Sequence, residues 1–253
     1  MPSTTPDLLH LCSNGDLPSL QEALSTTPSD PNMMQTLMTE ALKNDHADII
    51  QYLLSISPNI PVNEDVIRWS IYAGSVPMLS DLLAKDPSIL NMDFDMRGTP
   101  LAVAVMSKQP LLFLTFLLSS GADPNKPSNP LPMPLALAAK QYDTTAAVDL
   151  LLSYGANLEC SGALHAATCG GNVEMVRHLL QQGARPVTDV PKTPLPALAL
   201  HVAVKAGNIE ITKMLMDYGA DAMATDADGK TAIDLAETIG NQTLLEILLQ
   251  THR

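Results

Sequence analysis

The feature that most constrains the fold of this chain is a segment that occurs twice, 36 residues apart. Residues 162–184 read GALHAATCGGNVEMVRHLLQQGA, and residues 198–220 read LALHVAVKAGNIEITKMLMDYGA. The copies share Leu, Ala, Gly and Glu residues at matching positions, and His165 matches His201. A period of this length is typical of repeat proteins, in which each unit buries its apolar face against its neighbours.

Weaker copies of the segment extend over the rest of the chain. RGTPLAVAV begins at residue 97, MPLALAAK at residue 133 and DADGKTAIDLAETIG at residue 226, and the copies toward the N-terminus are more degenerate. We expect the first apolar residues of the inner helices, 29 to 36 positions apart, to be Leu8, Met38, Ile67, Leu101, Leu135, Leu164, Leu200 and Ile233. This regular spacing predicts about eight stacked units.

Within one unit the residues predict two short helices. Leu164, Ala166 and Ala167 give the first helix a small-residue face that lets neighbouring helices approach closely. The second helix carries apolar residues at helical spacing, namely Val173, Val176, Leu179 and Leu180. Gly183 follows, and glycine readily takes the left-handed conformation that ends a helix.

These units resemble the ankyrin repeat, whose signature combines T-P-L-H-x-A, a Gly between two short helices, a Leu-Leu pair and a closing Gly-Ala-Asp. The resemblance covers nearly the whole chain and is strongest at residues 162–184, 198–220 and 226–249. It implies an all-α fold, an ankyrin-repeat solenoid of stacked helix-turn-helix units joined by hairpin-like or proline-rich turns. We expect residues 1–253 to form a single solenoid, with degenerate repeats at 1–92, better-matched repeats at 93–225 and a capping repeat at 226–253.

Composition limits the kinds of partner and compartment. The 253 residues carry 14 Lys and Arg against 27 Asp and Glu, a net charge of −13 that repels nucleic acid and anionic membrane surfaces. No apolar run reaches membrane-spanning length, and the N-terminus lacks the basic start and apolar stretch of a secretory signal. Because there are only three cysteines, we expect a reducing, intracellular location, in the cytoplasm, the nucleus or both.

The residues that carry chemistry form no recognisable catalytic set. Phosphate-binding glycine loops, GxSxG elbows and HExxH helices are absent from the sequence. Cys160, His165 and Cys169 are close in sequence, but their spacing matches no standard zinc site. The resemblance implies structural roles for His165 and His201, whose rings would bond to turn backbone, and for His46. We therefore expect no metal and no cofactor, and the sequence favours a non-enzymatic protein.

The leading hypothesis is a protein-interaction module or adaptor. The resemblance implies that a partner binds the concave surface formed by inner helices and turn tips. The variable positions of that surface hold seven of the 14 Lys and Arg residues and are Lys43, Tyr72, Arg97, Lys108, Lys140, Tyr142, Lys192, Lys205 and Lys230. A basic groove in an acidic body favours an acidic segment of a partner protein. Nearby acids such as Asp226 and Asp228 leave open that the charges cancel.

A second hypothesis is a small-molecule-binding protein or enzyme. The connecting turns at residues 121–134 and 184–196 are rich in proline, which makes such segments stiff and extended. They flank the same two repeats and would wall a pocket near His165, Cys169 and His201. A deep, closed pocket there would favour this hypothesis, and an open groove would favour protein binding. A third hypothesis, a structural subunit of a larger assembly, predicts a broad apolar patch on the convex or end surface.

Overall fold

A computed structural model of the chain describes residues 7–26, 30–44, 46–57, 64–94, 98–126, 132–159, 161–186 and 198–250. Residue contacts divide the chain into two compact units, Met1–Phe94 and Asp95–Arg253, and each is described by itself. We call them unit 1 and unit 2. The described residues form sixteen α-helices, and this confirms the predicted all-α fold.

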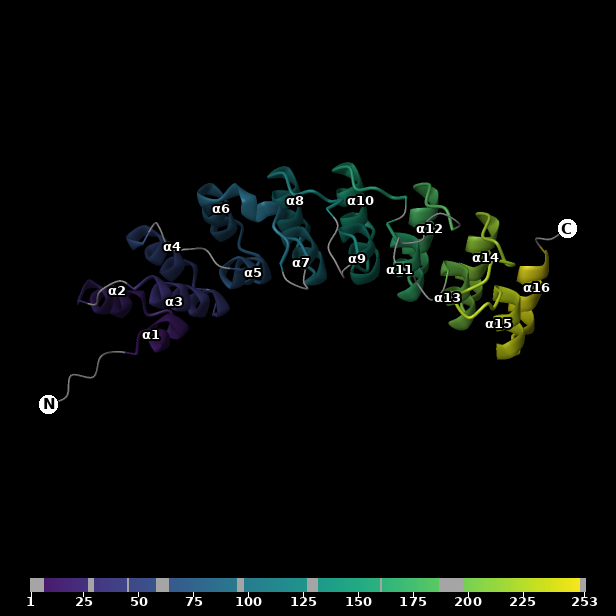
Figure 1. The fold of residues 1–253 in the computed structure, drawn as a ribbon, viewed down its shortest axis with the longest axis horizontal. Helices are drawn as coiled ribbons and strands as arrows, with labels where there is room; N and C mark the ends of the chain where they lie inside the picture. Colours follow the sequence, from purple (N-terminus) through teal and green to yellow (C-terminus); the bar gives the residue numbers. More distant parts are fainter. Residues whose placement is uncertain are drawn as a thin grey trace. The chain divides into compact units, whose positions relative to one another are not determined.

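Unit 1 contains three helix pairs followed by a short 3₁₀ helix (Figure 1). The pairs are α1 (Leu8–Asn14) with α2 (Leu17–Thr26), α3 (Pro31–Lys43) with α4 (Ala47–Ile56), and α5 (Glu64–Tyr72) with α6 (Val76–Lys85), and the 3₁₀ helix is η1 (Pro87–Asn91). Helix α3 contacts both α1 and α5, so the first helices of the three pairs pack side by side.

Unit 2 contains five helix pairs (Figure 1). They are α7 (Pro100–Met106) with α8 (Leu111–Ser119), α9 (Pro134–Gln141) with α10 (Ala146–Ser153), α11 (Ala163–Cys169) with α12 (Val173–Gln181), α13 (Ala199–Lys205) with α14 (Ile209–Asp217), and α15 (Ala232–Ile239) with α16 (Gln242–Gln250). Contacts run in series from α7 through α9, α11 and α13 to α15, which we call the inner helices. The second helices of the pairs, the outer helices, form the other layer, in which α12 contacts α14 and α14 contacts α16.

The core of unit 2 is aliphatic and depends on small residues between inner helices. In α11, Leu164 and Ala167 are fully buried, and Ala166 is partly exposed. Helix α11 lies between α9 and α13 and contacts both, as its small-residue face predicted. Gly183, just beyond the end of α12, has φ +100°, the left-handed conformation expected for the residue that ends this helix.

The start of one inner helix differs from its prediction. Met38 was expected to be the first apolar residue of its helix, but α3 begins at Pro31 and already buries Met34 and Leu37 before it. The helix starts early because the Asp30 side chain accepts a hydrogen bond from the Asn32 amide and Pro31 occupies the first turn. The other predicted starts all lie within inner helices, so the described residues contain the eight expected pairs.

The caps of the inner helices lead to a first prediction, on Leu198. Thr99 and Thr231 cap α7 and α15 by accepting the Ala102 and Asp234 amides. Leu198 caps α13 with a similar backbone (φ −69°, ψ 159°) but has no side-chain oxygen to accept an amide. We expect Leu198→Thr to raise the free energy of unfolding by about 1 kcal/mol in urea titrations. Thr99→Val is the reverse control and is expected to lower it by a similar amount, whereas no gain from Leu198→Thr would contradict the cap argument.

Candidate functional site

The candidate surface begins at the C-terminal ends of three neighbouring inner helices. Lys140, Cys169 and Lys205 each lie five residues after the first buried leucine of α9, α11 and α13, and all three are exposed. Adjacent helices of this series contact one another. A Cβ placed on Gly170 would lie 3.9 Å from the Lys140 carbonyl oxygen, so the end of α11 approaches the end of α9 closely. The structure therefore places two of the predicted lysines in one row.

The second lysine of the row is partly neutralised. Lys205 Nζ lies 3.4 Å from Asp226 Oδ2, and the Asp226 side chain is fully buried. Asp226 Oδ1 accepts the backbone amides of Asp228 and Lys230, both at 3.0 Å. The bond from the Lys230 amide contributes most to lowering the Asp226 pKa, and the Lys205 ammonium adds to it. The carboxylate thus stays charged, and it organises the turn before α15 and also pairs with Lys205.

His201 joins the same turn to α13. Its ring is fully buried, and Nε2 donates to the Lys230 carbonyl oxygen at 3.0 Å. This is the turn-backbone bond expected for that histidine. His46 makes a similar bond in unit 1, where Nε2 donates to the Ser13 carbonyl oxygen at 3.1 Å. Both histidines therefore connect successive repeats.

His165 differs from His201 although it has the same position in its repeat. Its ring is partly exposed, and Nε2 lies 3.4 Å from Cys169 Sγ on the same helix. Burial raises the pKa of the Cys169 thiol, and the charge of Lys140 opposes that rise. Because its pKa is raised, the Cys169 thiol is not shifted toward the reactive thiolate form.

Of the other two cysteines, the structure describes only Cys12. Cys12 is fully buried in α1, and desolvation raises the pKa of its thiol to about 11. Cys160 lies outside the described residues. Within the described ranges, no three His, Cys, Asp or Glu side chains are grouped so that they could hold a metal ion.

Two of the predicted contact residues, Lys108 and Tyr142, lie in the turns α7–α8 and α9–α10. These turns have four residues, one more than the turns α11–α12 and α13–α14. The Tyr142 hydroxyl donates to the Gln109 carbonyl oxygen at 2.7 Å and so ties the two turns together. Burial raises the Tyr142 pKa to about 12. Lys108 is exposed and has φ +54°.

Four more of the predicted contact residues lie either in unit 1 or outside the described residues. Lys43 and Tyr72 belong to unit 1, where Lys43 Nζ pairs with Glu40 Oε2 at 3.2 Å and the Tyr72 ring packs edge-on against Trp69. Arg97 and Lys192 lie outside the described residues. In unit 2 the described candidates are thus Lys108, Lys140, Tyr142, Lys205 and Lys230.

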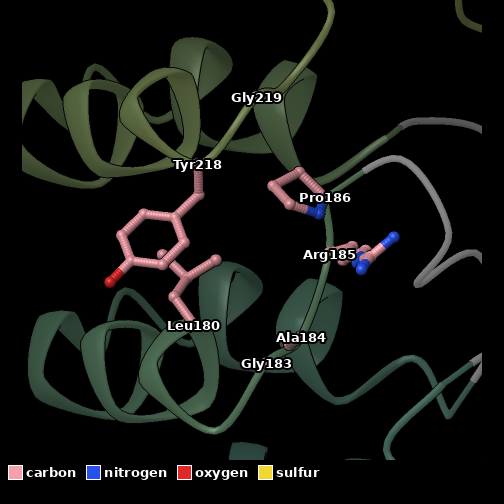
Figure 2. A pocket seen from close by; sticks show the side chains of 7 residues that line it. All are labelled: Leu180, Gly183, Ala184, Arg185, Pro186, Tyr218 and Gly219. Atoms are coloured by element: carbon pink, nitrogen blue, oxygen red, sulfur yellow. The ribbon is translucent and has the colours of Figure 1, made fainter.

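A hollow of about 520 Å³ lies between the C-terminal ends of α12 and α14. Its lining is Leu180, Gly183, Ala184, Arg185, Pro186, Tyr218 and Gly219. Figure 2 shows Tyr218 and Leu180 on one side and Pro186 on the other, with the Arg185 side chain directed away from them. Tyr218 is 49% exposed, so the hollow is open to solvent.

The hollow differs from the pocket of the small-molecule hypothesis. It shares only residues 184–186 with the second proline-rich turn, and most of that turn lies outside the described residues. His165, Cys169 and His201 are not among its lining residues. Between α8 and α10 the corresponding place is bridged by Asn125, which donates to the Gly155 carbonyl oxygen and accepts the Asn157 amide. Much of the predicted pocket's wall, residues 127–131 and 187–197, lies outside the described residues.

Within the part of the chain that the structure describes, no helix is both long and apolar enough to cross a membrane.

Comparison with known proteins reveals similarity to repeat proteins. Residues 101–190 match the family described as ankyrin repeats (3 copies), and residues 196–236 match ankyrin repeats (many copies). The protein named "Putative palmitoyltransferase ZDHHC13" from Danio rerio is 28% identical over 162 residues, which are 59% of this chain and 24% of that protein. The chain therefore corresponds to about a quarter of this relative's length. The crystal structure of the human ASB11 ankyrin repeat domain matches with a TM-score of 0.55 and 21% identity, over 97% of each chain.

Proposed function

Because the chain belongs to the ankyrin-repeat family, we propose that it is a non-enzymatic interaction module whose inner-helix face binds an acidic segment of a partner protein. Ankyrin repeats generally mediate binding between proteins. The observation that carries the choice of surface is the exposed row at the ends of α9, α11 and α13, where Lys140 and Lys205 flank Cys169. The low cysteine content, three residues in 253, supports a reducing compartment for this interaction.

The distribution of charge supports an acidic ligand for unit 2. Eleven of the 14 Lys and Arg residues belong to residues 95–253, together with 15 of the 27 Asp and Glu residues. Residues 1–94 carry the other three cations against 12 acids. An acidic segment is therefore repelled more strongly by unit 1 than by unit 2, and the uncompensated Lys140 gives it a favourable contact.

The geometry of the row also suggests a spacing for the ligand's acids. Packed helices lie about 8–10 Å apart, so the ends of α9 and α13, two steps along the series, are separated by roughly 20 Å. An extended peptide covers about 3.3–3.6 Å per residue and spans that distance in about six residues. We therefore expect the partner segment to carry acidic residues about six positions apart.

The test compares two charge reversals in the full chain. Lys140→Glu reverses the cation of the row that makes no ion pair with any described residue, and Lys213→Glu makes the same change on the outer helix α14 as a matched control. Lys205 is left in place because a glutamate beside the buried Asp226 would destabilise the fold. A partner captured by the wild type is identified by mass spectrometry, and its affinity for each variant is measured by calorimetry at low and moderate salt.

We expect Lys140→Glu to weaken this partner about tenfold at low salt and less at moderate salt, because salt screens exposed charges. Lys213→Glu is expected to bind like the wild type. If Lys140→Glu binds the partner as tightly as the wild type, or if both variants bind it equally, the partner does not bind at the inner-helix row.

A further inference from the structure

Helix α8 differs from the other outer helices of unit 2 in having no charged residue. Its sequence is LLFLTFLLS, with Phe113, Leu114, Leu117 and Leu118 buried. Leu112 is 76% exposed, more than any other large apolar side chain that the structure describes, and Leu111 beside it is 40% exposed. The positions that match Leu112 in α12 and α14 hold Glu174 and Glu210, which are both exposed. An apolar surface therefore lies at the start of α8 where α12 and α14 have a charged one.

The turn just before α8 carries a second anomaly. Lys108 is the only residue other than glycine with positive φ among the described ranges. The equivalent turn positions in five other repeats are Gly15, Gly74, Gly171, Gly207 and Gly240, all with positive φ, whereas Tyr142 in the α9–α10 turn has φ −93°. A side chain in this conformation costs about 1 kcal/mol relative to glycine. The fold therefore tolerates strain in order to present a lysine here, and such strain is often found at functional sites.

The strained turn is rigid. The Gln109 amide donates to the Ala104 carbonyl oxygen at 3.0 Å, the bond that closes the end of α7. The Gln109 carbonyl oxygen accepts the Tyr142 hydroxyl from the next repeat, and Pro110 fixes the entry into α8. Lys108 makes no ion pair with any residue that the structure describes. The charge and the two leucines are thus held in place before any ligand arrives, which reduces the entropy lost on binding.

We propose that this turn is a docking surface for a partner segment that carries an acidic residue next to leucine-like side chains. The partner's carboxylate pairs with the Lys108 ammonium, and its apolar side chains cover Leu111 and Leu112. Charge complementarity selects this occupant, because α8 has no acidic residue and Lys108 makes no ion pair with the residues that the structure describes. A basic or wholly apolar segment would leave Lys108 without compensation. The two leucines belong to an outer helix and Lys140 belongs to an inner helix, so Leu112→Glu and Lys140→Glu test the two proposals separately.

The repeats themselves provide variants that keep the fold. Leu112→Glu installs the residue found at the same position in α12 and α14, and Lys108→Gly installs the residue found in the equivalent turns. Lys108→Gly relieves the strained conformation and is expected to raise the midpoint of urea unfolding. Lys108→Arg keeps both the charge and the strain and is the conservative control. Lys213→Glu, on the outer helix α14, is the control for a charge reversal outside this surface.

The probe is a fluorescein-labelled 15-residue amphipathic helical peptide with Leu on one face and Glu beside it, and a matched peptide carries Lys for each Glu. Fluorescence anisotropy with the full chain measures their dissociation constants. We expect the Glu peptide to bind the wild type, Lys108→Arg and Lys213→Glu alike. Leu112→Glu and Lys108→Gly are each expected to bind it at least fivefold more weakly, with folding intact by circular dichroism.

Three outcomes would overturn the proposal. The first is equal binding of the Glu and Lys peptides, and the second is undiminished binding by Leu112→Glu. The third is self-association of the wild type in sedimentation velocity that Leu112→Glu abolishes, because the occupant would then be a second copy of the chain. A stability gain in Lys108→Gly together with a loss of peptide affinity would be the result that a purely structural lysine cannot produce.

Discussion

Replacing His201 with alanine is expected to lower the free energy of unfolding by about 3 kcal/mol, because it leaves a buried acceptor without its donor and opens a cavity. The ring is fully buried, and its Nε2 supplies the bond to the Lys230 carbonyl oxygen. That carbonyl belongs to the turn that the Thr225–Thr231 bridge and Asp226 hold together before α15. The variant should therefore weaken the attachment of the last helix pair more than the rest of unit 2.

Two measurements check this expectation. Urea unfolding gives the overall loss, and amide hydrogen exchange shows whether α15 and α16 open first. The matched control is His165→Ala, at the same position of the preceding repeat, where the ring is partly exposed and its Nε2 lies 3.4 Å from Cys169 Sγ. Its expected loss is under about 1 kcal/mol. Similar losses for the two variants would mean that the bond to Lys230 does not hold the final repeat.

The second large effect is expected in α8, where Phe113→Ala should cost about 3–5 kcal/mol. The Phe113 ring is 2% exposed, and its loss leaves a cavity in the close-packed core of unit 2. Phe116→Ala makes the same chemical change three residues later, on a ring that is partly exposed and 6.5 Å away between centroids. We expect Phe116→Ala to cost less than half as much.

Urea unfolding of the two phenylalanine variants, followed by far-UV circular dichroism, measures this difference. A smaller loss at Phe113 than at Phe116 would contradict the burial seen for α8. It would also weaken the docking proposal, because that proposal depends on which face of this uncharged helix is exposed.

The repeat architecture was predictable because it depends on local patterns. Apolar spacing, glycine at helix ends and small residues such as Ala167 act over a single unit, and each recurs along the chain. The start predicted at Met38 was wrong because Asp30 and Pro31 cap the helix several residues before its repeat motif begins, and buried Val66 precedes Ile67 in α5. The structural role of His201 was also expected from its repeat position, and the bond to Lys230 agrees with it.

The candidate surface was only partly predictable because a side chain's partners come from distant residues. The sequence identified Lys140 and Lys205 equally, but only the structure pairs Lys205 with the buried Asp226 and leaves Lys140 available. Tyr142 was predicted as a contact residue, and its hydroxyl bonds to the Gln109 carbonyl oxygen across 33 residues. The hollow between Leu180 and Tyr218 was not found from the sequence, because it depends on how two repeats pack.

By itself the sequence determined the kind of fold, the number of helix pairs and the acidic character of the chain, since these follow from periodicity and composition. The tertiary structure decided which charges remain uncompensated, which of the matched histidines is buried, and where the backbone is strained. Lys108 shows the reason. Nothing in the sequence distinguishes it from other surface lysines, whereas the structure gives it a positive φ in the turn that joins α7 and α8. Local pattern selects the repeat, and the packing of repeats against one another gives each exposed residue its environment.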